Sequence, residues 1–133
     1  MNAEHHRPLP AYLEQAQPLQ AAVRSGPELS IIVPTFNERE NIAELIGRLV
    51  LCMGSRSWEV VFVDDDSPDG TAHVVREHAT EDSRVRCVQR IGRRGLSSAC
   101  IEGMLATTAP FIAVMDADLQ HDEKLLPQML DTL

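Results

Sequence analysis

Two carboxylates spaced one residue apart follow an apolar run near the C-terminal end of the sequence. The run FIAVM (111–115) leads directly into Asp116 and Asp118. Side chains two positions apart in an extended segment point to the same side, so both carboxylates could bind one hard cation, Mg²⁺ or Mn²⁺. Gln120 could orient a phosphate group or the cation shell, and His121 is interpreted as a loop residue rather than a supporting partner. An isolated Asp-x-Asp pair is more often a solvated turn, but its place after an apolar run favours a metal.

A second acidic cluster, DDDSPDG (64–70), follows the apolar run WEVVFV (58–63). Neighbouring carboxylates repel each other unless donors or a cation lie nearby. An acid here could accept hydrogen bonds from ribose hydroxyls or from the N–H groups of a base. We expect Asp66 and Asp69 to be solvated or to cap the next helix. For the cluster taken alone, a structural role is as well supported as a binding role.

The segment PTFNE (34–38) follows the first apolar run, LSIIV (29–33). Pro34 is expected to end that strand, because proline has no N–H to donate. Asn37 and Glu38 fit helix capping and pairing with the helix dipole. The alternative is that Glu38, with the backbone near Pro34 and Phe36, holds part of a ligand.

Arginines are concentrated between residues 84 and 94. The run RIGRRG (90–95) is interpreted as a solvated loop, and the alternative is contact with anionic phosphate groups, which arginine suits. It does not have the Gly-x4-Gly-Lys-Ser/Thr pattern of a phosphate-binding P-loop.

The elements that must position these clusters alternate between strands and helices. Apolar runs predict strands at 29–33, 58–63, 84–90 and 110–115, the third nearer an edge. Helices are expected at about 37–53, 71–80, 95–108 and 122–133. This order predicts an α/β fold with a mainly parallel sheet covered by helices on both faces. Ligands of such sheets bind beyond the carboxyl ends of the strands, where all three clusters lie.

Local signals suggest where the helices begin. Asn37 and Glu40 have the spacing of a capping box. Ser67 is expected to be an N-cap, with Pro68 at the first helical position. Gly103 would allow close packing of its helix, and Pro127 is expected in the first turn of the last helix.

Composition limits the class of protein. The chain has 133 residues, 44% of them apolar, and a formal net charge of −8, which fits one domain and argues against nucleic acid as a partner. No apolar run is long enough to span a bilayer, and the first residues lack a secretory pattern, so we expect a cytoplasmic location. Cys52, Cys87 and Cys100 are expected to be buried, reduced thiols. Residues 1–28 hold four of the eight prolines and are interpreted as an N-terminal extension, partly disordered or packed on a neighbour, with a possible short helix at 12–24.

Four motifs together resemble a known family. SIIVPTFNERENI, VVFVDDDSPDGT, RRGLSSACIEGM and VMDADLQH, in this order and spacing, resemble glycosyltransferase family 2 of the GT-A fold over about residues 29–133. Within it they are most similar to dolichyl- or polyprenyl-phosphate mannosyltransferases. The resemblance implies a Rossmann-like GT-A domain that transfers a sugar with inversion, typically mannose from GDP-mannose, to a lipid phosphate at a membrane surface. It also implies a peripheral location at the cytoplasmic membrane face.

The resemblance also implies roles for individual residues. The positions matching the nucleoside site are Pro34, Phe36, Glu38, Val63 and Asp65. The positions matching the metal and diphosphate site are Asp116, Ala117, Asp118 and Gln120. Asp118 is the best candidate for a direct metal ligand, with Asp116 beside it. Phe36 departs from the more usual tyrosine, which keeps stacking but loses a hydroxyl contact. Arg94 stands where a lysine or arginine often precedes Gly-Leu.

The family domain normally continues well beyond the metal motif, so the GT-A domain looks truncated. The alternative function is a non-catalytic module that binds nucleotide-sugar and metal, with a homo-oligomer or a partner supplying the acceptor-binding half. A signalling domain of the doubly wound type is disfavoured, because it would need a lysine after a later strand and the sequence has only Lys124, in the last helix.

Overall fold

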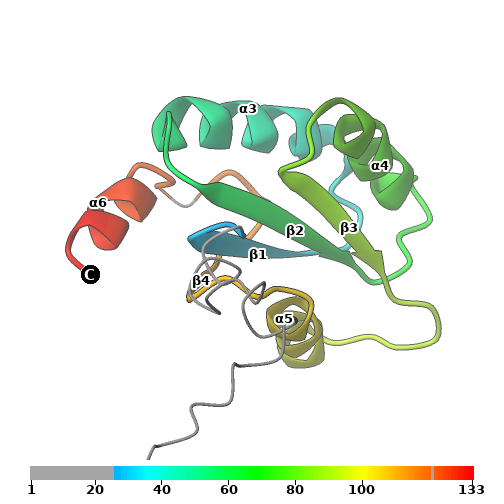
Figure 1. Cartoon of the computed structure of the whole chain (residues 1–133). Coiled ribbons are helices and arrows are strands. Elements are labelled where there is room, and N and C mark those ends of the chain that lie inside the picture. The colour runs from blue at the N-terminus through cyan, green and yellow to red at the C-terminus, as the bar shows by residue number, and fades with distance from the viewer. Residues whose placement is uncertain (1–25, 121) are drawn as a thin grey trace, which may run out of the picture.

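Four parallel strands form one sheet in the computed structural model, which describes residues 26–120 and 122–133. They are β1 (Leu29–Thr35), β2 (Trp58–Asp64), β3 (Val85–Gln89) and β4 (Phe111–Val114), in the order β3-β2-β1-β4 (Figure 1). The predicted parallel sheet is therefore confirmed, and the third strand lies at an edge as expected. The helix predicted at 12–24, like most of the predicted N-terminal extension, lies outside the described residues.

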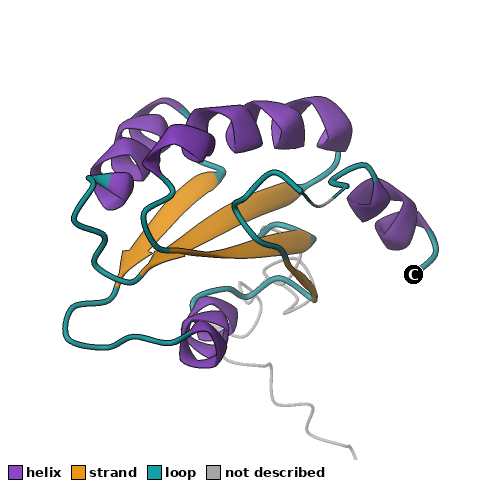
Figure 2. Ribbon diagram, turned by 180° about the vertical axis from the view of Figure 1, so that it is seen from behind, coloured by secondary structure: helices purple, strands orange, loops and turns teal. Residues whose placement is uncertain are grey.

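Helices cover both faces of the sheet, as predicted. The helices α3 (Ile42–Met53) and α4 (Thr71–Glu81) lie over one face, and α5 (Leu96–Leu105) lies over the other (Figures 1 and 2). A short α6 (Leu125–Asp131) packs beside α3, with Pro127 in its first turn as predicted. None of the helices in the described part of the chain is long and apolar enough to cross a membrane.

The two faces of the sheet bury different side chains, because alternate residues of a strand point to opposite sides. Ile31 and Val33 of β1 join the larger core beneath α3 and α4. Ile32 joins the smaller core beneath α5, together with Val61, Val63 and Ala99. The central strand β2 is buried along its whole length, so its apolar run is continuous rather than alternating.

Close packing at Gly103 is confirmed. This glycine of α5 is buried against the sheet, and a Cβ at this position would overlap the Cγ2 atom of Ile32 and lie 3.0 Å from the Cγ2 atom of Val63. The absence of a side chain is what lets α5 approach β1 and β2.

The strand β1 does not end at Pro34, which corrects the sequence prediction. Pro34 pairs with Val63, and the strand continues to Thr35. The N–H of Met115 donates to the carbonyl of Ile32, and β4 ends at Val114, so the side of β1 that Pro34 faces has no neighbouring strand at that level. Proline is tolerated there because no ladder hydrogen bond is lost.

The capping residues predicted for two helices are wrong, although the second helix begins at Thr71 as predicted. A 3-10 helix (Arg39–Asn41) precedes α3, and Asn37 adopts a positive φ of 54° instead of capping. The helix α4 begins only at Thr71, after Gly70 with φ 87°, so Ser67 and Pro68 lie in the preceding turn. One chain of hydrogen bonds explains why neither Asn37 nor Ser67 caps a helix. The backbone N–H of Asn37 donates to the Ser67 hydroxyl, and this hydroxyl donates to Asp64.

The three cysteines are free thiols, as predicted, but they are half-buried rather than fully buried. Burial raises the pKa of the Cys87 thiol, which keeps it protonated at neutral pH.

Candidate functional site: a polar rim at the carboxyl ends of the strands

The parallel register brings the three polar clusters to one edge of the sheet. Thr35 at the end of β1 pairs with Asp64 at the end of β2, and the N–H of Asp65 donates to the carbonyl of Thr35 at 3.1 Å. The acidic turn 116–120 follows the parallel strand β4 on the other side of β1. Asp65 and Asp118 therefore open on the same edge, which we call the polar rim (residues 34–38, 64–70 and 116–120).

Asp64 organises the rim from inside. Its carboxylate is fully buried and accepts hydrogen bonds from the Thr35 hydroxyl at 2.9 Å, the Ser67 N–H at 2.9 Å and the Ser67 hydroxyl at 2.6 Å. The Ser67 hydroxyl also accepts the N–H of Asn37 at 2.9 Å. One buried acid thus ties the turn after β2 to the turn after β1, and it has no access to a ligand.

Asp65, the next residue, is only partly buried and is held at both oxygens. Its Oδ1 accepts a hydrogen bond from the Nε–H of Arg90 at 2.7 Å, and its Oδ2 accepts the N–H of Gly95 at 3.0 Å. Burial acts to raise the pKa of Asp65, but the bonds from Arg90 and Gly95 outweigh it and hold that pKa below its usual range. Asp65 is therefore a carboxylate at any physiological pH.

Arg90 is not part of a solvated loop, which corrects that interpretation for this residue. Its side chain is 0% exposed, whereas Arg93 and Arg94 of the same run are exposed as expected. The only sequence signal is the place of Arg90 at the end of the predicted third strand (84–90), and arginine is so rarely buried that this place alone does not indicate burial.

Phe36 offers an aromatic surface on the rim. Its side chain is 45% exposed, and the guanidinium of Arg94 lies 5.0 Å from the centre of its ring. This cation–π contact joins the turn after β1 to the loop after β3. Pro34 is partly exposed beside it, whereas the side chain of Val63 is fully buried under α5, so Val63 can offer a ligand only its backbone.

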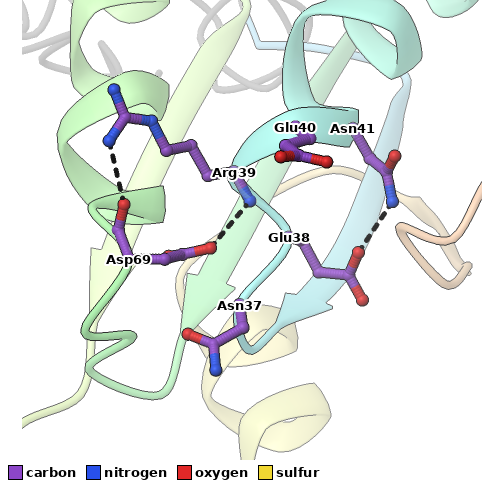
Figure 3. A pocket seen from close by; sticks show the side chains of 6 residues that line it. All are labelled: Asn37, Glu38, Arg39, Glu40, Asn41 and Asp69. Carbon is purple, nitrogen blue, oxygen red and sulfur yellow. Dashed lines mark hydrogen bonds between the residues drawn. The ribbon is translucent and has the colours of Figure 1, made fainter.

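Two pockets flank Asp65 and Glu38. One, of about 500 Å³, is lined by Asn37, Glu38, Arg39, Glu40, Asn41 and Asp69 (Figure 3). Within it the Glu38 carboxylate accepts a bond from the side-chain amide of Asn41 at 2.9 Å, and the Arg39 N–H donates to Asp69. The other, of about 480 Å³, is lined by Asp65, Asp66, Arg90, Gly92, Arg93 and Arg94.

Asp69 shapes the first pocket rather than binding in it. Its carboxylate accepts the N–H and the hydroxyl of Thr71 at the start of α4. Burial acts to raise the pKa of Asp69, but the bonds from Thr71 and Arg39 lower it overall. The predicted capping role of Asp69 is thus close to what is observed, and Asp66, also predicted to be solvated, is exposed with one bond from Gln89.

Asp116 and Asp118 are both exposed. Met115, which precedes them, and Ala117, which lies between them, are buried. This alternation is what an extended segment requires for two carboxylates that face one side. The N–H of Gln120 donates to the Asp118 carboxylate at 3.1 Å. His121 lies outside the described residues.

The donor set at residues 116–118 fits a divalent cation that is completed by a ligand. Two carboxylates supply the hard oxygen donors that Mg²⁺ and Mn²⁺ prefer. Among residues 26–120 and 122–133, no three or more metal-binding side chains converge. An ion here would therefore take its remaining oxygens from water and from a bound phosphate group, which is how Mg²⁺ is commonly held.

Acid should destabilise the fold below about pH 4. The pKa values of Asp65, Asp69 and Asp82 lie below their usual range; for Asp82, the bond from Arg84 is the main cause. A lowered folded-state pKa contributes stability above the ordinary carboxyl pKa of about 3.9 and loses it as pH falls through the folded value. Urea unfolding should give a constant free energy of unfolding from pH 7 to 5 and a decline below pH 4. A free energy that does not decline by pH 3 would contradict these assignments, and Asp82→Asn should make the decline shallower.

Comparisons with known proteins agree with this geometry. A model of glycosyl transferase family 2 matches residues 30–133. The dolichol-phosphate mannosyltransferase of Pyrococcus furiosus is 39% identical over 106 residues, which cover 80% of this chain and 30% of that protein. The enzyme of the same name from Saccharomyces cerevisiae is 38% identical over 109 residues, covering 80% of this chain and 41% of that protein.

Solved structures give the same result. A mannosyltransferase from Pyrobaculum calidifontis, in complex with GDP-Man and Mn²⁺, is 28% identical with a TM-score of 0.67, and the match covers 81% of this chain and 32% of that one. The GT-A-like fold is thus shown. The chain spans less than half the length of each of these relatives.

Proposed function

The chain belongs to glycosyltransferase family 2, and from this premise we propose that it forms the donor-binding part of an inverting glycosyltransferase. The proposed donor is GDP-mannose and the proposed acceptor is a polyprenyl or dolichyl phosphate at the cytoplasmic membrane face. The observation that carries the proposal is the polar rim, where Phe36, Asp65 and Asp118 come from three segments of the chain to one edge of the sheet.

The nucleoside is proposed to bind at the ends of β1 and β2. Phe36 supplies an exposed ring on which a base can stack, and Pro34 borders it. Asp65 supplies carboxylate lone pairs for ribose hydroxyls or base N–H groups. Glu38 supplies a second carboxylate from its pocket, and Val63 contributes backbone only.

The diphosphate and a divalent cation are proposed to bind at the end of β4. Asp118 and Asp116 would hold Mg²⁺ or Mn²⁺, with Gln120 and the backbone of Ala117 beside the phosphates. When bound, the cation offsets the negative charge that develops on the departing nucleoside diphosphate. This matters in a chain of net charge −8, which otherwise repels an anionic donor.

The acceptor requires little activation from the protein. A phosphate monoester has a second pKa of about 6, so it is mostly a dianion near neutral pH and already a nucleophile. The residues of the chain then act by binding and orienting the donor, and no side chain is assigned as a general base.

A second candidate function is a module that binds nucleotide-sugar and metal without catalysis. The residues of the polar rim account for binding of the donor and the cation under either candidate. Under this alternative a second copy or a partner protein supplies the acceptor site.

Calorimetry and a transfer assay test the proposal and separate the two candidates. The chain should bind GDP in the presence of Mn²⁺ and bind it much more weakly with a chelator. Release of GDP from GDP-mannose upon addition of polyprenyl phosphate would support the transferase, and binding without release would support the module. No binding of GDP or UDP with Mn²⁺ would overturn both.

A further inference from the structure

Arg90 is a buried arginine at the polar rim to which the proposed function gives no role. Its side chain is fully buried although it directly follows the edge strand β3. Each of its three guanidinium nitrogens has a partner: Nε donates to Asp65, Nη1 to the Ser98 hydroxyl at 2.8 Å and Nη2 to the carbonyl of Gly95 at 3.1 Å. Its backbone N–H donates to the carbonyl of Asp64 at 2.8 Å.

These bonds close a ring around the Asp65 carboxylate. Gly95 donates its N–H to one oxygen of Asp65 and accepts the guanidinium of Arg90 at its carbonyl. Ser98, in the first turn of α5, bonds to both Arg90 and Gly95. Contacts from the end of β3 and from the start of α5 therefore fix the orientation of the Asp65 carboxylate together. One hydrogen bond from a flexible side chain would leave the carboxylate free to rotate.

The ring leaves Asp65 able to bind a ligand. A carboxylate has about four lone-pair directions, and two of them are used by Arg90 and Gly95. The Asp65 side chain retains 13% exposure and lines the pocket of about 480 Å³. Two lone pairs are thus left in a fixed direction at the wall of this pocket.

We infer that Arg90 is a positioning residue for nucleoside recognition, acting through Asp65. This inference rests on the proposed function, which places the nucleoside at Asp65. The planar guanidinium matters because its donors lie in a rigid fork, so Asp65, Ser98 and Gly95 are held at fixed mutual angles. Lysine keeps the charge but has no such fork.

Arg90→Gln and Arg90→Lys test the inference by calorimetry. With saturating Mn²⁺, Arg90→Gln should bind GDP about 10- to 100-fold more weakly, by analogy with the loss of hydrogen-bond partners that orient metal ligands. Pyrophosphate lacks the nucleoside and so makes no contact with Asp65. With Mn²⁺, the affinity of Arg90→Gln for pyrophosphate should therefore lie within about twofold of the wild-type affinity. Arg90→Lys should lose less GDP affinity than Arg90→Gln but should not regain wild-type affinity.

Arg84→Gln is the matched control. Like Arg90, Arg84 forms an ion pair with an aspartate: its side chain donates two hydrogen bonds to Asp82, at the opposite end of the sheet from the polar rim. Its loss should leave both affinities unchanged. Wild-type GDP affinity in Arg90→Gln would overturn the inference, and so would an equal loss of GDP and pyrophosphate affinity, which indicates a merely structural role.

A measurement on the wild type keeps the inference testable if Arg90→Gln does not fold. The Nε–H of Arg90 should exchange slowly with solvent, and its resonance should shift when GDP binds with the diamagnetic ion Mg²⁺, but not when pyrophosphate binds with Mg²⁺. An unmoved resonance would overturn the inference while leaving the proposed function intact. Failure of the wild type to bind GDP or UDP would instead overturn the proposed function, and the inference with it.

Discussion

Asp118→Asn is expected to weaken Mn²⁺-supported binding of GDP by at least about 100-fold, which corresponds to about 2.7 kcal/mol. Asp118 is one of the two exposed carboxylates within residues 116–120, and no larger metal-binding cluster exists among the described residues that could replace it. An amide oxygen is neutral and so loses most of its attraction for a divalent cation. Calorimetric titration of GDP at fixed Mn²⁺ measures the effect.

The effect should disappear when the metal is removed. With a chelator present, wild type and Asp118→Asn should bind GDP equally and weakly, because the lost interaction acts through the cation. Glu81→Gln is the control, since Glu81 is an exposed carboxylate at the C-terminal end of α4, outside the polar rim, and the substitution changes the charge equally. Equal Mn²⁺-supported binding by wild type and Asp118→Asn would show that the cation, if any, is held elsewhere.

The order of the elements and the location of the rim could be predicted because both follow from short-range patterns. Ile31, Ile32 and Val33 are apolar in succession because β1 is covered on both faces, and α3 shows its buried side every three or four residues. Once the strands are parallel, the carboxyl-end rule brings residues 34–38, 64–70 and 116–120 together without further information.

Which residues of the polar rim are structural and which line a pocket could not be predicted, because this depends on contacts between residues far apart in the sequence. Asp64 and Asp65 are adjacent residues of the same type. Their hydrogen-bond partners, Thr35 for Asp64 and Arg90 for Asp65, show that Asp64 is a buried structural residue and that Asp65 lines a pocket. Asn37 was predicted to cap a helix, but its N–H is taken by Ser67, 30 positions away. Arginine is usually exposed, so the burial of Arg90 became visible only with Asp65 and Ser98 placed around it.

Asp64→Ala is expected to reduce the free energy of unfolding by about 2–4 kcal/mol, because three hydrogen bonds to a buried side chain are lost and their donors are left unpaired. The Thr35 hydroxyl and both donors of Ser67 lose their acceptor together, and two of these three bonds are 2.9 Å long and one 2.6 Å. Buried donors without a partner lose their hydration and gain nothing in return. Urea unfolding monitored by circular dichroism gives the free energy directly.

Asp131→Ala is the matched control for this loss. Asp131 accepts two hydrogen bonds from Arg56, but its side chain is 60% exposed, so water replaces the lost contacts. Exposed ion pairs of this kind contribute little to stability, because water and salt screen them. If Asp64→Ala cost no more than Asp131→Ala, the two turns would be held together by strand pairing alone. The larger loss is expected chiefly because Asp64 is buried and Asp131 is exposed.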